Sequence, residues 1–225
     1  MKIAEVFYSV QGEGKLVGVP SVFVRTSGCN LRCVWCDTPY TSWAPEGVAR
    51  TVSSLVEEVM AFGARHVVVT GGEPLIAPEV VLLTSELRAR GMHITVETAG
   101  TVYAPVACDL MSISPKLANS TPSEDPKWGP VHERTRLRLD VLGQLLADYD
   151  YQLKFVVSDP ADLGEILDLV SNLGAPAEHV LLMPEGRSPE VLRERALWLV
   201  PLCLEHGFRY SPRVQVDIWG DRRGV

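Results

Sequence analysis

The sequence predicts an α/β fold with a mainly parallel sheet, arranged as a partial (β/α)6-type open barrel. Short β-branched segments alternate along the chain with segments that carry helix-capping residues, and the connections between them are short. Such repeats favour parallel strands joined by right-handed crossovers. A closed eight-fold barrel typically needs about 250 residues, and only about six units are recognisable here. The 225 residues therefore predict one core domain, residues 1–225, whose barrel stays open.

The expected strands are rich in β-branched and aromatic residues. In chain order they are Ile3 to Tyr8, Val22 to Thr26, His66 to Thr70, His93 to Glu97, Asp109 to Ser114, Gln152 to Val157 and His179 to Met183. In parallel α/β folds the active site lies at the carboxyl ends of the strands. We therefore expect Thr70, Glu97, Ser114, Ser158 and Met183 to face the site.

The expected helices are bounded by start and stop signals. Ser54 and Glu57 form a capping-box pair for a helix that ends at Gly63. Pro78 in the first turn opens the next helix, which Gly91 ends. The remaining helices are expected from about Glu133 to Ala147, from Asp159-Pro160 to Gly174, and from Ser188-Pro189 onward with a bend at Pro201.

One long segment has no periodic pattern. Residues Lys116 to Val131 read KLANSTPSEDPKWGPV, which is polar and contains three prolines. Long connections of this kind are commonly functional loops. We expect a polar loop or lid at about 116–131.

Composition and charge exclude several classes of protein. The chain is 46% hydrophobic and 22% charged, which is typical of ordered globular proteins. Its net charge of −7 disfavours a nucleic-acid partner or an anionic membrane surface. No apolar run approaches the ~20 residues that a membrane span requires. Because Met1 to Glu5 lacks the pattern of a signal peptide, we expect a cytoplasmic protein.

Three of the five cysteines, Cys29, Cys33 and Cys36, lie within eight residues. Cytosolic thiols are kept reduced, so metal binding is a better explanation than disulfides. Structural zinc normally takes four protein ligands. Three thiolates on a [4Fe-4S] cluster would leave one iron open to an external ligand. The alternatives are ordinary loop cysteines, or a zinc ion completed by a distant residue. We expect Cys108 and Cys203 to be inert packing residues.

The spacing C-x3-C-x2-C, with Trp35 directly before Cys36, resembles the signature of the radical S-adenosylmethionine (SAM) superfamily. Gly71-Gly72-Glu73-Pro74 resembles the second motif of that superfamily, whose backbone meets the amino group of SAM. Glycine permits such a close approach. The resemblance implies the radical SAM type of partial barrel, a [4Fe-4S] cluster and SAM. In these enzymes the reduced cluster cleaves SAM, and the resulting 5′-deoxyadenosyl radical abstracts hydrogen from the substrate.

Further segments resemble one family within this superfamily, the 7-carboxy-7-deazaguanine synthases. They are Glu5 to Gly14, Val22 to Cys29, Cys36 to Thr38, Thr70 to Pro74, Glu97-Thr98, Ser114 to Lys116, Met183 to Gly186, Trp219-Gly220 and Arg223 to Val225. The resemblance implies a lyase that converts 6-carboxy-5,6,7,8-tetrahydropterin to 7-carboxy-7-deazaguanine with loss of ammonia, in queuosine and 7-deazapurine biosynthesis. It also implies a homodimer and an electron donor such as flavodoxin or ferredoxin.

The same resemblance implies roles for individual residues. The implied substrate residues are Val10, Gln11, Gly12, Glu13, Arg25 and Thr70. Those implied around SAM are Trp35, Asp37, Gly72, Ser114, Pro115, Lys116, Met183, Pro184, Glu185 and Gly186. Thr38 is the implied Mg²⁺ ligand, although Asp37 would serve equally on chemistry alone. Gln11 and Glu13 suit the amide-like edge of a pterin, and the planar fork of Arg25 suits its carboxylate.

Some positions depart from the family pattern or stay unassigned. Gln215-Val216-Asp217 stands where the family often has Gln-x-His, so Asp217 either faces solvent or accepts a hydrogen bond from the pterin. Ala99 replaces a frequent Asn. The carboxylate of Val225 is a further candidate contact. By residue type alone, Glu13, Glu97 and Asp217 are candidate bases, and no single one can be chosen.

Two other functions compete with this interpretation. An activating enzyme that makes a glycyl radical on a partner protein shares the cysteine motif and GGEP. The segments Gln11 to Gly14 and Ser114 to Lys116 favour a pocket for a small molecule instead. A non-catalytic metal-binding or electron-transfer module would need a fourth cluster ligand and no SAM loop.

Overall fold

The computed structural model describes residues 1–225 and contains one nine-stranded sheet in the order β3-β1-β2-β4-β5-β6-β7-β8-β9. β2 and the six strands from β4 to β9 form one parallel series. β1 is antiparallel to both β2 and β3. The two outer strands, β3 and β9, do not pair with each other, so the sheet is open. The predicted mainly parallel, partial barrel is confirmed.

The strands follow the predicted segments closely. Their bounds are β1 Lys2–Val10, β2 Pro20–Thr26, β3 Val48–Ala49, β4 His66–Gly71, β5 His93–Thr98, β6 Leu110–Ile113, β7 Tyr151–Val157, β8 Val180–Pro184 and β9 Arg209–Tyr210. β3 and β9 have two residues each and were not predicted, because such short strands carry no alternation pattern.

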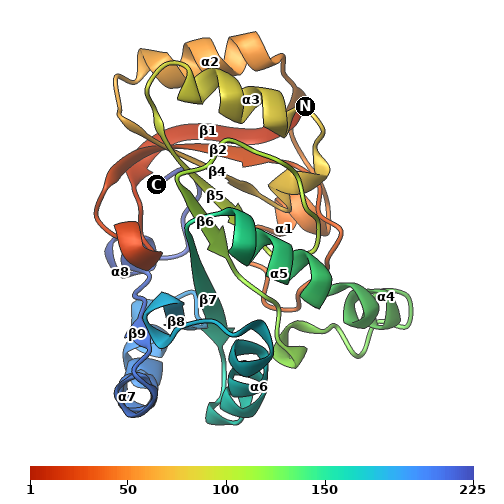
Figure 1. Ribbon diagram of the computed structural model, residues 1–225, viewed down its shortest axis with the longest axis vertical. Coiled ribbons are helices and arrows are strands. Elements are labelled where there is room, and N and C mark those ends of the chain that lie inside the picture. Colours follow the sequence, from red (N-terminus) through yellow and green to blue (C-terminus); the bar gives the residue numbers. More distant parts are fainter.

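Helices cover the sheet on its outer side, with α2 and α3 together at one end and α6 and α7 at the other (Figure 1). The α-helices are α1 Pro39–Ser42, α2 Val52–Ala61, α3 Val80–Arg88, α4 Trp128–Thr135, α5 Leu139–Asp148, α6 Leu163–Leu173, α7 Pro189–His206 and α8 Val214–Trp219. Single 3₁₀ turns are η1 Gly14–Leu16, η2 Pro74–Ile76, η3 Ala118–Ser120, η4 Pro160–Asp162 and η5 Ala177–His179. None of these helices combines the length and apolar character that crossing a membrane requires.

One hydrophobic core of 33 buried residues joins the sheet to the helices. The central strands are buried on both faces, with helices on the outer side and the barrel interior on the other; all four residues of β6 are buried. On the outer side, α6 contributes Ile166 and Leu169 to this core. Cys203 lies in the same core and Cys108 packs against it, in agreement with their predicted packing role.

Two predicted helix starts are wrong by a few residues. α2 begins earlier than expected because Thr51, not Ser54, is the N-cap: the Thr51 hydroxyl accepts a hydrogen bond from the Ser54 amide at 3.2 Å. Pro78 lies two residues before α3 rather than in its first turn. α7 begins after Ser188 as predicted and continues as one helix past Pro201 to His206.

The segment at 116–131 contains more regular structure than predicted. It includes η3, and α4 begins inside it at Trp128, where Asp125 accepts hydrogen bonds from the amides of Lys127 and Trp128. The predicted helix from Glu133 to Ala147 is in fact the end of α4 and a separate α5.

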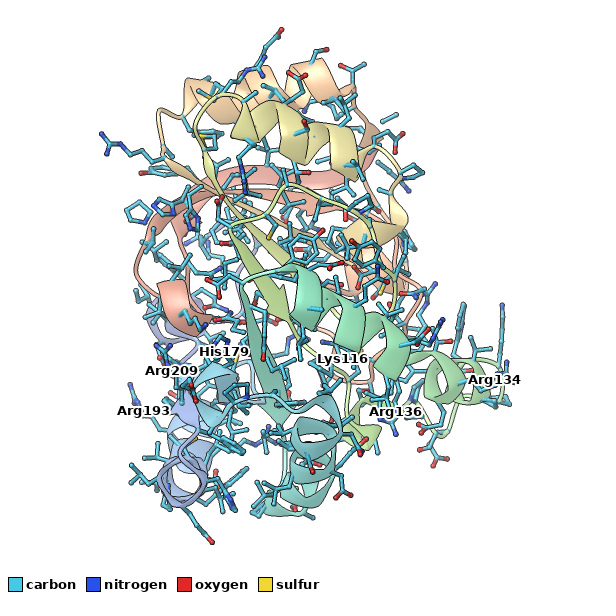
Figure 2. The ribbon with its side chains drawn as sticks, viewed as in Figure 1. Lys116, Arg134, Arg136, His179, Arg193 and Arg209 are labelled. Carbon is cyan, nitrogen blue, oxygen red and sulfur yellow. The ribbon has the colours of Figure 1, made fainter.

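A polar anchor accounts for this break. Arg136, just after α4, is buried and turns inward to bond Lys116 O at 3.0 Å and Glu165 at 2.6 Å. Lys116 and Arg136 lie beside the α4–α5 junction, whereas Arg134, in the last turn of α4, points away from it (Figure 2). The pattern of apolar residues could not predict this helix end, because the contacts of a buried arginine determine it.

Phe155, at the centre of β7, is wholly buried. We expect Phe155→Ala to lower the free energy of unfolding by about 3–5 kcal/mol, because the vacated volume loses both burial and packing contacts. Leu197→Ala is the matched control, since Leu197 is 80% exposed; it should change stability by less than about 0.5 kcal/mol. Urea unfolding of both variants measures the difference, and equal losses would contradict this description of the core.

Candidate active site

A cavity opens at the carboxyl ends of the parallel strands, where α/β folds place their sites. Most of the predicted site residues line it: Val10, Gln11, Gly12, Glu13, Arg25, Cys29, Cys33, Trp35, Cys36, Asp37, Thr38, Thr70, Gly72, Ser114, Lys116, Met183 and Glu185. Three predicted residues, Pro115, Pro184 and Gly186, are buried behind this lining instead. The expectation that Ser158 faces the site is wrong, because Ser158 does not line the cavity and its hydroxyl bonds Asp162. The fold therefore gathers segments from almost the full length of the chain into one site.

The three clustered cysteines lie on the loop between β2 and α1, which we call the cysteine loop (residues 29–36). Burial raises the pKa of the Cys29 thiol to about 11 and that of Cys33 to about 12. A bound metal centre would offset the cost of forming thiolates here. Cys36 Sγ lies 3.3 Å from the Ser42 hydroxyl.

The cysteine loop holds no three-ligand site for a single metal ion and packs tightly against the glycine motif. No three His, Cys, Asp or Glu side chains are arranged to hold one metal ion. Each thiolate of an iron-sulfur cluster binds a different iron, so its ligands do not converge on one point. Gly72 packs tightly on this loop: a Cβ there would lie 2.8 Å from Cys29 Cβ and 2.2 Å from Gly28 O. The glycine motif thus lies directly against the cysteines.

Glu73, the acidic residue of the GGEP turn, is a structural brace. It is wholly buried, and its carboxylate accepts hydrogen bonds from the Thr98 hydroxyl at 2.8 Å and from the amides of Ala99 and Leu75 at 2.8 and 3.1 Å. Burial raises its pKa. Glu73 therefore joins the turn after β4 to the end of β5, an assignment that the motif alone did not reveal.

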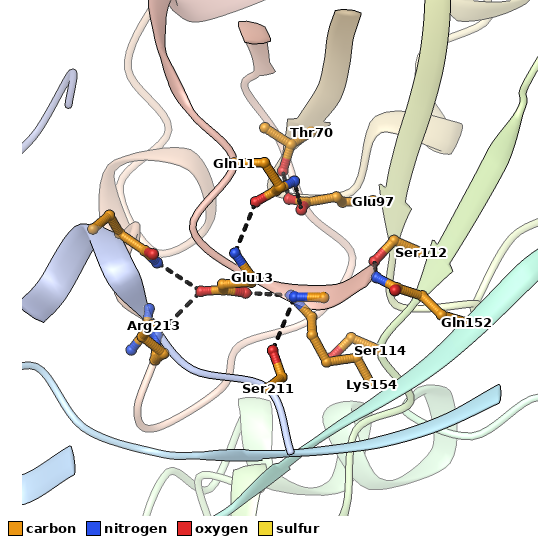
Figure 3. Close-up of polar contacts among 12 residues, drawn as sticks. Gln11, Glu13, Thr70, Glu97, Ser112, Ser114, Gln152, Lys154, Ser211 and Arg213 are labelled. Atoms are coloured by element: carbon orange, nitrogen blue, oxygen red, sulfur yellow. Dashed lines mark hydrogen bonds and ion pairs between the residues drawn. The ribbon is translucent and has the colours of Figure 1, made fainter. Parts of the chain in front are cut away.

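Glu13 is the centre of a buried charge network (Figure 3). Its carboxylate pairs with the Lys154 ammonium, and it accepts hydrogen bonds from Arg213 Nε at 3.1 Å and Gln215 Nε2 at 2.7 Å. Arg213 also bonds Asp37 of the loop that follows Cys36, and donates to Gly186 O at 2.6 Å. The network ties the end of β1 to β7, to the segment before α8 and to two loops of the cavity.

Opposite charges determine the protonation states in this network. Burial by itself would raise the pKa of Glu13, but Lys154 and Arg213 outweigh it, so that pKa lies well below its ordinary value. Burial would lower the pKa of Lys154, and Glu13 with Glu97 raises it instead. Glu13 is therefore a carboxylate and Lys154 an ammonium at neutral pH.

A second polar group lies beside this network, around Glu97 at the end of β5. Gln11 Nε2 donates to one oxygen of Glu97 at 3.2 Å, and the Thr70 hydroxyl donates to the other at 2.8 Å (Figure 3). Of the candidate bases, Glu13 and Glu97 line the cavity. Asp217 is exposed on α8 and does not line it, so the alternative that faces solvent is the correct one.

Arg25 is held at the cavity wall by Glu5, whose carboxylate accepts from Arg25 Nε at 2.9 Å and from the Tyr40 hydroxyl at 2.9 Å. The C-terminal tail joins this group, because Arg223 pairs with Glu5 at 3.1 Å and stacks 3.5 Å from the Tyr40 ring. Residues 220–225 line the cavity, including Val225. The tail therefore closes one side of the site.

Sequence reasoning missed three of the central residues, Lys154, Arg213 and Gln215. Lys154 carried a signal: it is the single charged residue in the strand Tyr151–Val157, which is otherwise almost wholly buried. Arg213 lies 200 residues from its partner Glu13 and follows no motif, so only the fold brings the two together.

The sequence profile of the radical SAM superfamily matches residues 23–138. A 7-carboxy-7-deazaguanine synthase of Halobacterium salinarum is 48% identical over 98% of this chain and 91% of its own length. That of Rhodopirellula baltica is 48% identical over 99% and 88%, respectively. The crystal structure of QueE from Escherichia coli superposes with a TM-score of 0.70 at 25% identity, covering 95% of this chain and 93% of that one.

The open parallel barrel, the cysteine loop and the adjoining glycine motif together define a radical SAM enzyme. Identity of 48% across nearly the whole chain narrows this further. The chain belongs to the family of 7-carboxy-7-deazaguanine synthases.

Replacing Lys154 with Met should leave Glu13 underpaired in a buried site. We expect a loss of up to about 3–5 kcal/mol in the free energy of unfolding at pH 7, because a buried charge without its partner is strongly destabilising. The depressed pKa of Glu13 stabilises the fold above its ordinary value of 4.5, and this contribution is lost as the pH falls. The gap between variant and wild type should therefore narrow below about pH 4.5.

Arg138→Met is the control for this measurement, because Arg138 forms an exposed ion pair with Asp140. It should change the free energy of unfolding very little at either pH, because solvent screens an exposed ion pair. If Lys154→Met lowers the free energy of unfolding no more than the control does, the ion pair between Glu13 and Lys154 does not stabilise the fold.

Proposed function

We propose that this protein is a lyase that converts 6-carboxy-5,6,7,8-tetrahydropterin to 7-carboxy-7-deazaguanine with loss of ammonia, in queuosine and 7-deazapurine biosynthesis. One observation carries the proposal. The three cysteines and the polar groups Gln11, Glu13 and Arg25 line the same cavity, so a cluster and a pterin carboxylate can be bound side by side. Membership of the 7-carboxy-7-deazaguanine synthase family supports this substrate and product.

The two ends of the substrate are recognised by different groups. Arg25 uses Nε for Glu5, which leaves its two terminal nitrogens to grip the pterin carboxylate as a fork. Glu13 stays ionised, and a carboxylate has about four lone-pair sites, so it can still accept N–H groups from the amide-like edge. Gln11, Val10, Gly12 and Thr70 complete this side of the cavity.

Cys29, Cys33 and Cys36 are the proposed ligands of the [4Fe-4S] cluster. When bound, the reduced cluster and SAM supply the 5′-deoxyadenosyl radical that begins the reaction. The residues proposed to surround SAM are Trp35, Asp37, Gly72, Ser114, Pro115, Lys116, Met183, Pro184, Glu185 and Gly186. Their part is to position the cosubstrate and exclude water and side reactions.

Aromatisation requires removal of a proton, and two of the candidate bases named from the sequence, Glu13 and Glu97, line the cavity. The depressed pKa of Glu13 makes it a poor proton acceptor. Glu97 is therefore the proposed base, oriented by Gln11 and Thr70. The Lys154 ammonium keeps its proton and holds Glu13 in the form that accepts hydrogen bonds.

Other parts of the proposal rest mainly on the family resemblance. Thr38 is the proposed Mg²⁺ ligand, and the pairing of Asp37 with Arg213 supports Thr38 over Asp37. We further propose a cytoplasmic homodimer, reduced by a flavodoxin or ferredoxin. The continuous core, which draws on residues from Ile3 to Cys203, supports a single radical SAM domain over residues 1–225.

The decisive assay incubates the reconstituted protein without oxygen with 6-carboxy-5,6,7,8-tetrahydropterin, SAM, Mg²⁺ and a reductant. We expect 7-carboxy-7-deazaguanine by mass analysis. Arg25→Gln should lower kcat/KM by about 10-fold or more, because a charge-assisted hydrogen bond contributes about 1.5–3 kcal/mol. Product only in the presence of a partner protein would favour the activating-enzyme alternative, and no 5′-deoxyadenosine at all would remove both enzyme functions.

Alanine at Cys29, Cys33 or Cys36 should each abolish the iron-sulfur absorbance that depends on all three thiolates, since each removes one ligand. Cys108→Ala and Cys203→Ala are the matched controls, because both thiols pack at the core away from the cavity. They should retain the full spectrum after reconstitution. An intact cluster spectrum in any variant of the first three would refute the ligand assignment.

A further inference from the structure

His132 of α4 is wholly buried and lies against the cysteine loop, 100 residues away along the chain. Its Nδ1 accepts a hydrogen bond from the backbone amide of Arg32 at 3.0 Å. Its Nε2 lies 2.9 Å from the hydroxyl of Ser120 in η3. The ring therefore bridges the cysteine loop and η3, and neither the predicted motifs nor the proposed reaction uses it.

The hydrogen bonds determine which ring nitrogen carries the proton. The Ser120 hydroxyl donates its single proton to Leu117 O at 2.6 Å, so it accepts from Nε2–H. Nδ1 is then unprotonated and free to accept from Arg32. His132 is thus a neutral acceptor that Ser120 orients toward the loop.

A second contact supports the loop next to the first. The amide of Val34 donates to Ser120 O at 2.9 Å, so the amides on either side of Cys33 are both bound by the His132–Ser120 pair. Trp35 Nε1 also donates to Asn119 O and Oδ1, each at 3.2 Å. Without these partners the loop, which has no helix or strand of its own, would leave these amides unpaired.

The support is anchored in turn to the barrel. Asn119 Nδ2 donates to Val156 O of β7 at 3.1 Å and to Asp162 at 2.7 Å. Beyond α4, Arg136 bonds Lys116 O and Glu165. The loop is therefore held against an element whose own position the core determines.

We propose that His132, oriented by Ser120, is a positioning residue that holds the cysteine loop in the conformation needed to retain the cluster. The proposal rests on the proposed function, because it takes Cys29, Cys33 and Cys36 as the ligands. Groups that orient metal ligands from behind typically change metal affinity on the order of 10- to 100-fold when they are removed. Cluster retention is therefore the property that His132 controls most directly.

The test compares the rate at which an iron chelator strips the reconstituted protein in wild type, His132→Leu and His132→Asn. Leu keeps much of the volume but removes both hydrogen bonds, and we expect cluster loss on the order of 10-fold faster or more. The Oδ1 of Asn can take the place of Nδ1 and accept from Arg32, so His132→Asn should stay closer to wild type than His132→Leu.

His179→Leu is the matched control. His179 also bonds the backbone through Nδ1, in its case Tyr151 O at 2.9 Å, but it lies across the molecule from α4 (Figure 2). It should release iron at the wild-type rate. Urea unfolding of the apo proteins measures how far each variant is destabilised in general. If His132 positions the loop, His132→Leu should release iron faster than a variant with the same free energy of unfolding.

Ser120→Ala keeps the backbone contact with Val34 and removes only the group that orients the ring, so it should release iron at an intermediate rate. This variant decides the question if His132→Leu does not fold. Wild-type release rates in Ser120→Ala and His132→Leu, or equal rates in the Leu and Asn variants, would overturn the proposal. Failure of the wild-type protein itself to assemble a cluster would instead refute the proposed function.

Discussion

A buried carboxylate must be paired, and the pairing of Glu13 determines how the site is assembled. Lys154 comes from the middle of β7 and Arg213 from the segment before α8, and Arg213 then reaches Asp37 beyond the cysteines. These ion pairs therefore hold together segments that lie far apart in the sequence. Each charge is buried only because its partner from another segment offsets the cost of removing it from water. The network also supplies the polar floor that the proposed substrate requires.

The cysteine loop is held from two directions. On the cavity side, Gly28 and Gly72 let the GGEP turn pack directly against it, and Glu73 braces that turn to β5. Behind the loop, His132 and Ser120 bind the amides on either side of Cys33. A loop without regular structure gains its conformation from these neighbours, which is how a rigid scaffold positions a functional loop.

Most of the fold could be predicted because it depends on local patterns. The main strands were predicted from β-branched runs, and Gly63, Gly91 and Gly174 marked helix ends through the positive φ that they adopt. The predicted bounds are wrong where side-chain hydrogen bonds, some of them to distant residues, determine where a helix begins or ends. Thr51 rather than Ser54 caps α2, and the segment at 116–131 forms η3 and part of α4 because Ser120, His132 and Arg136 bond inward.

The sequence by itself determined the local chemistry of the site: the spacing of the three cysteines, the glycines that allow close packing, the segment Gln11 to Glu13 that suits the amide-like edge of the proposed pterin, and Arg25 that suits its carboxylate. Motifs of this kind consist of residues close together in the sequence, so they can be recognised without the structure. The tertiary structure alone decided which charges are neutralised, which of the candidate bases line the cavity, and what supports the cysteine loop. Those properties depend on pairs such as Glu13 with Arg213 and Arg32 with His132, which are 200 and 100 residues apart and meet only when the sheet forms.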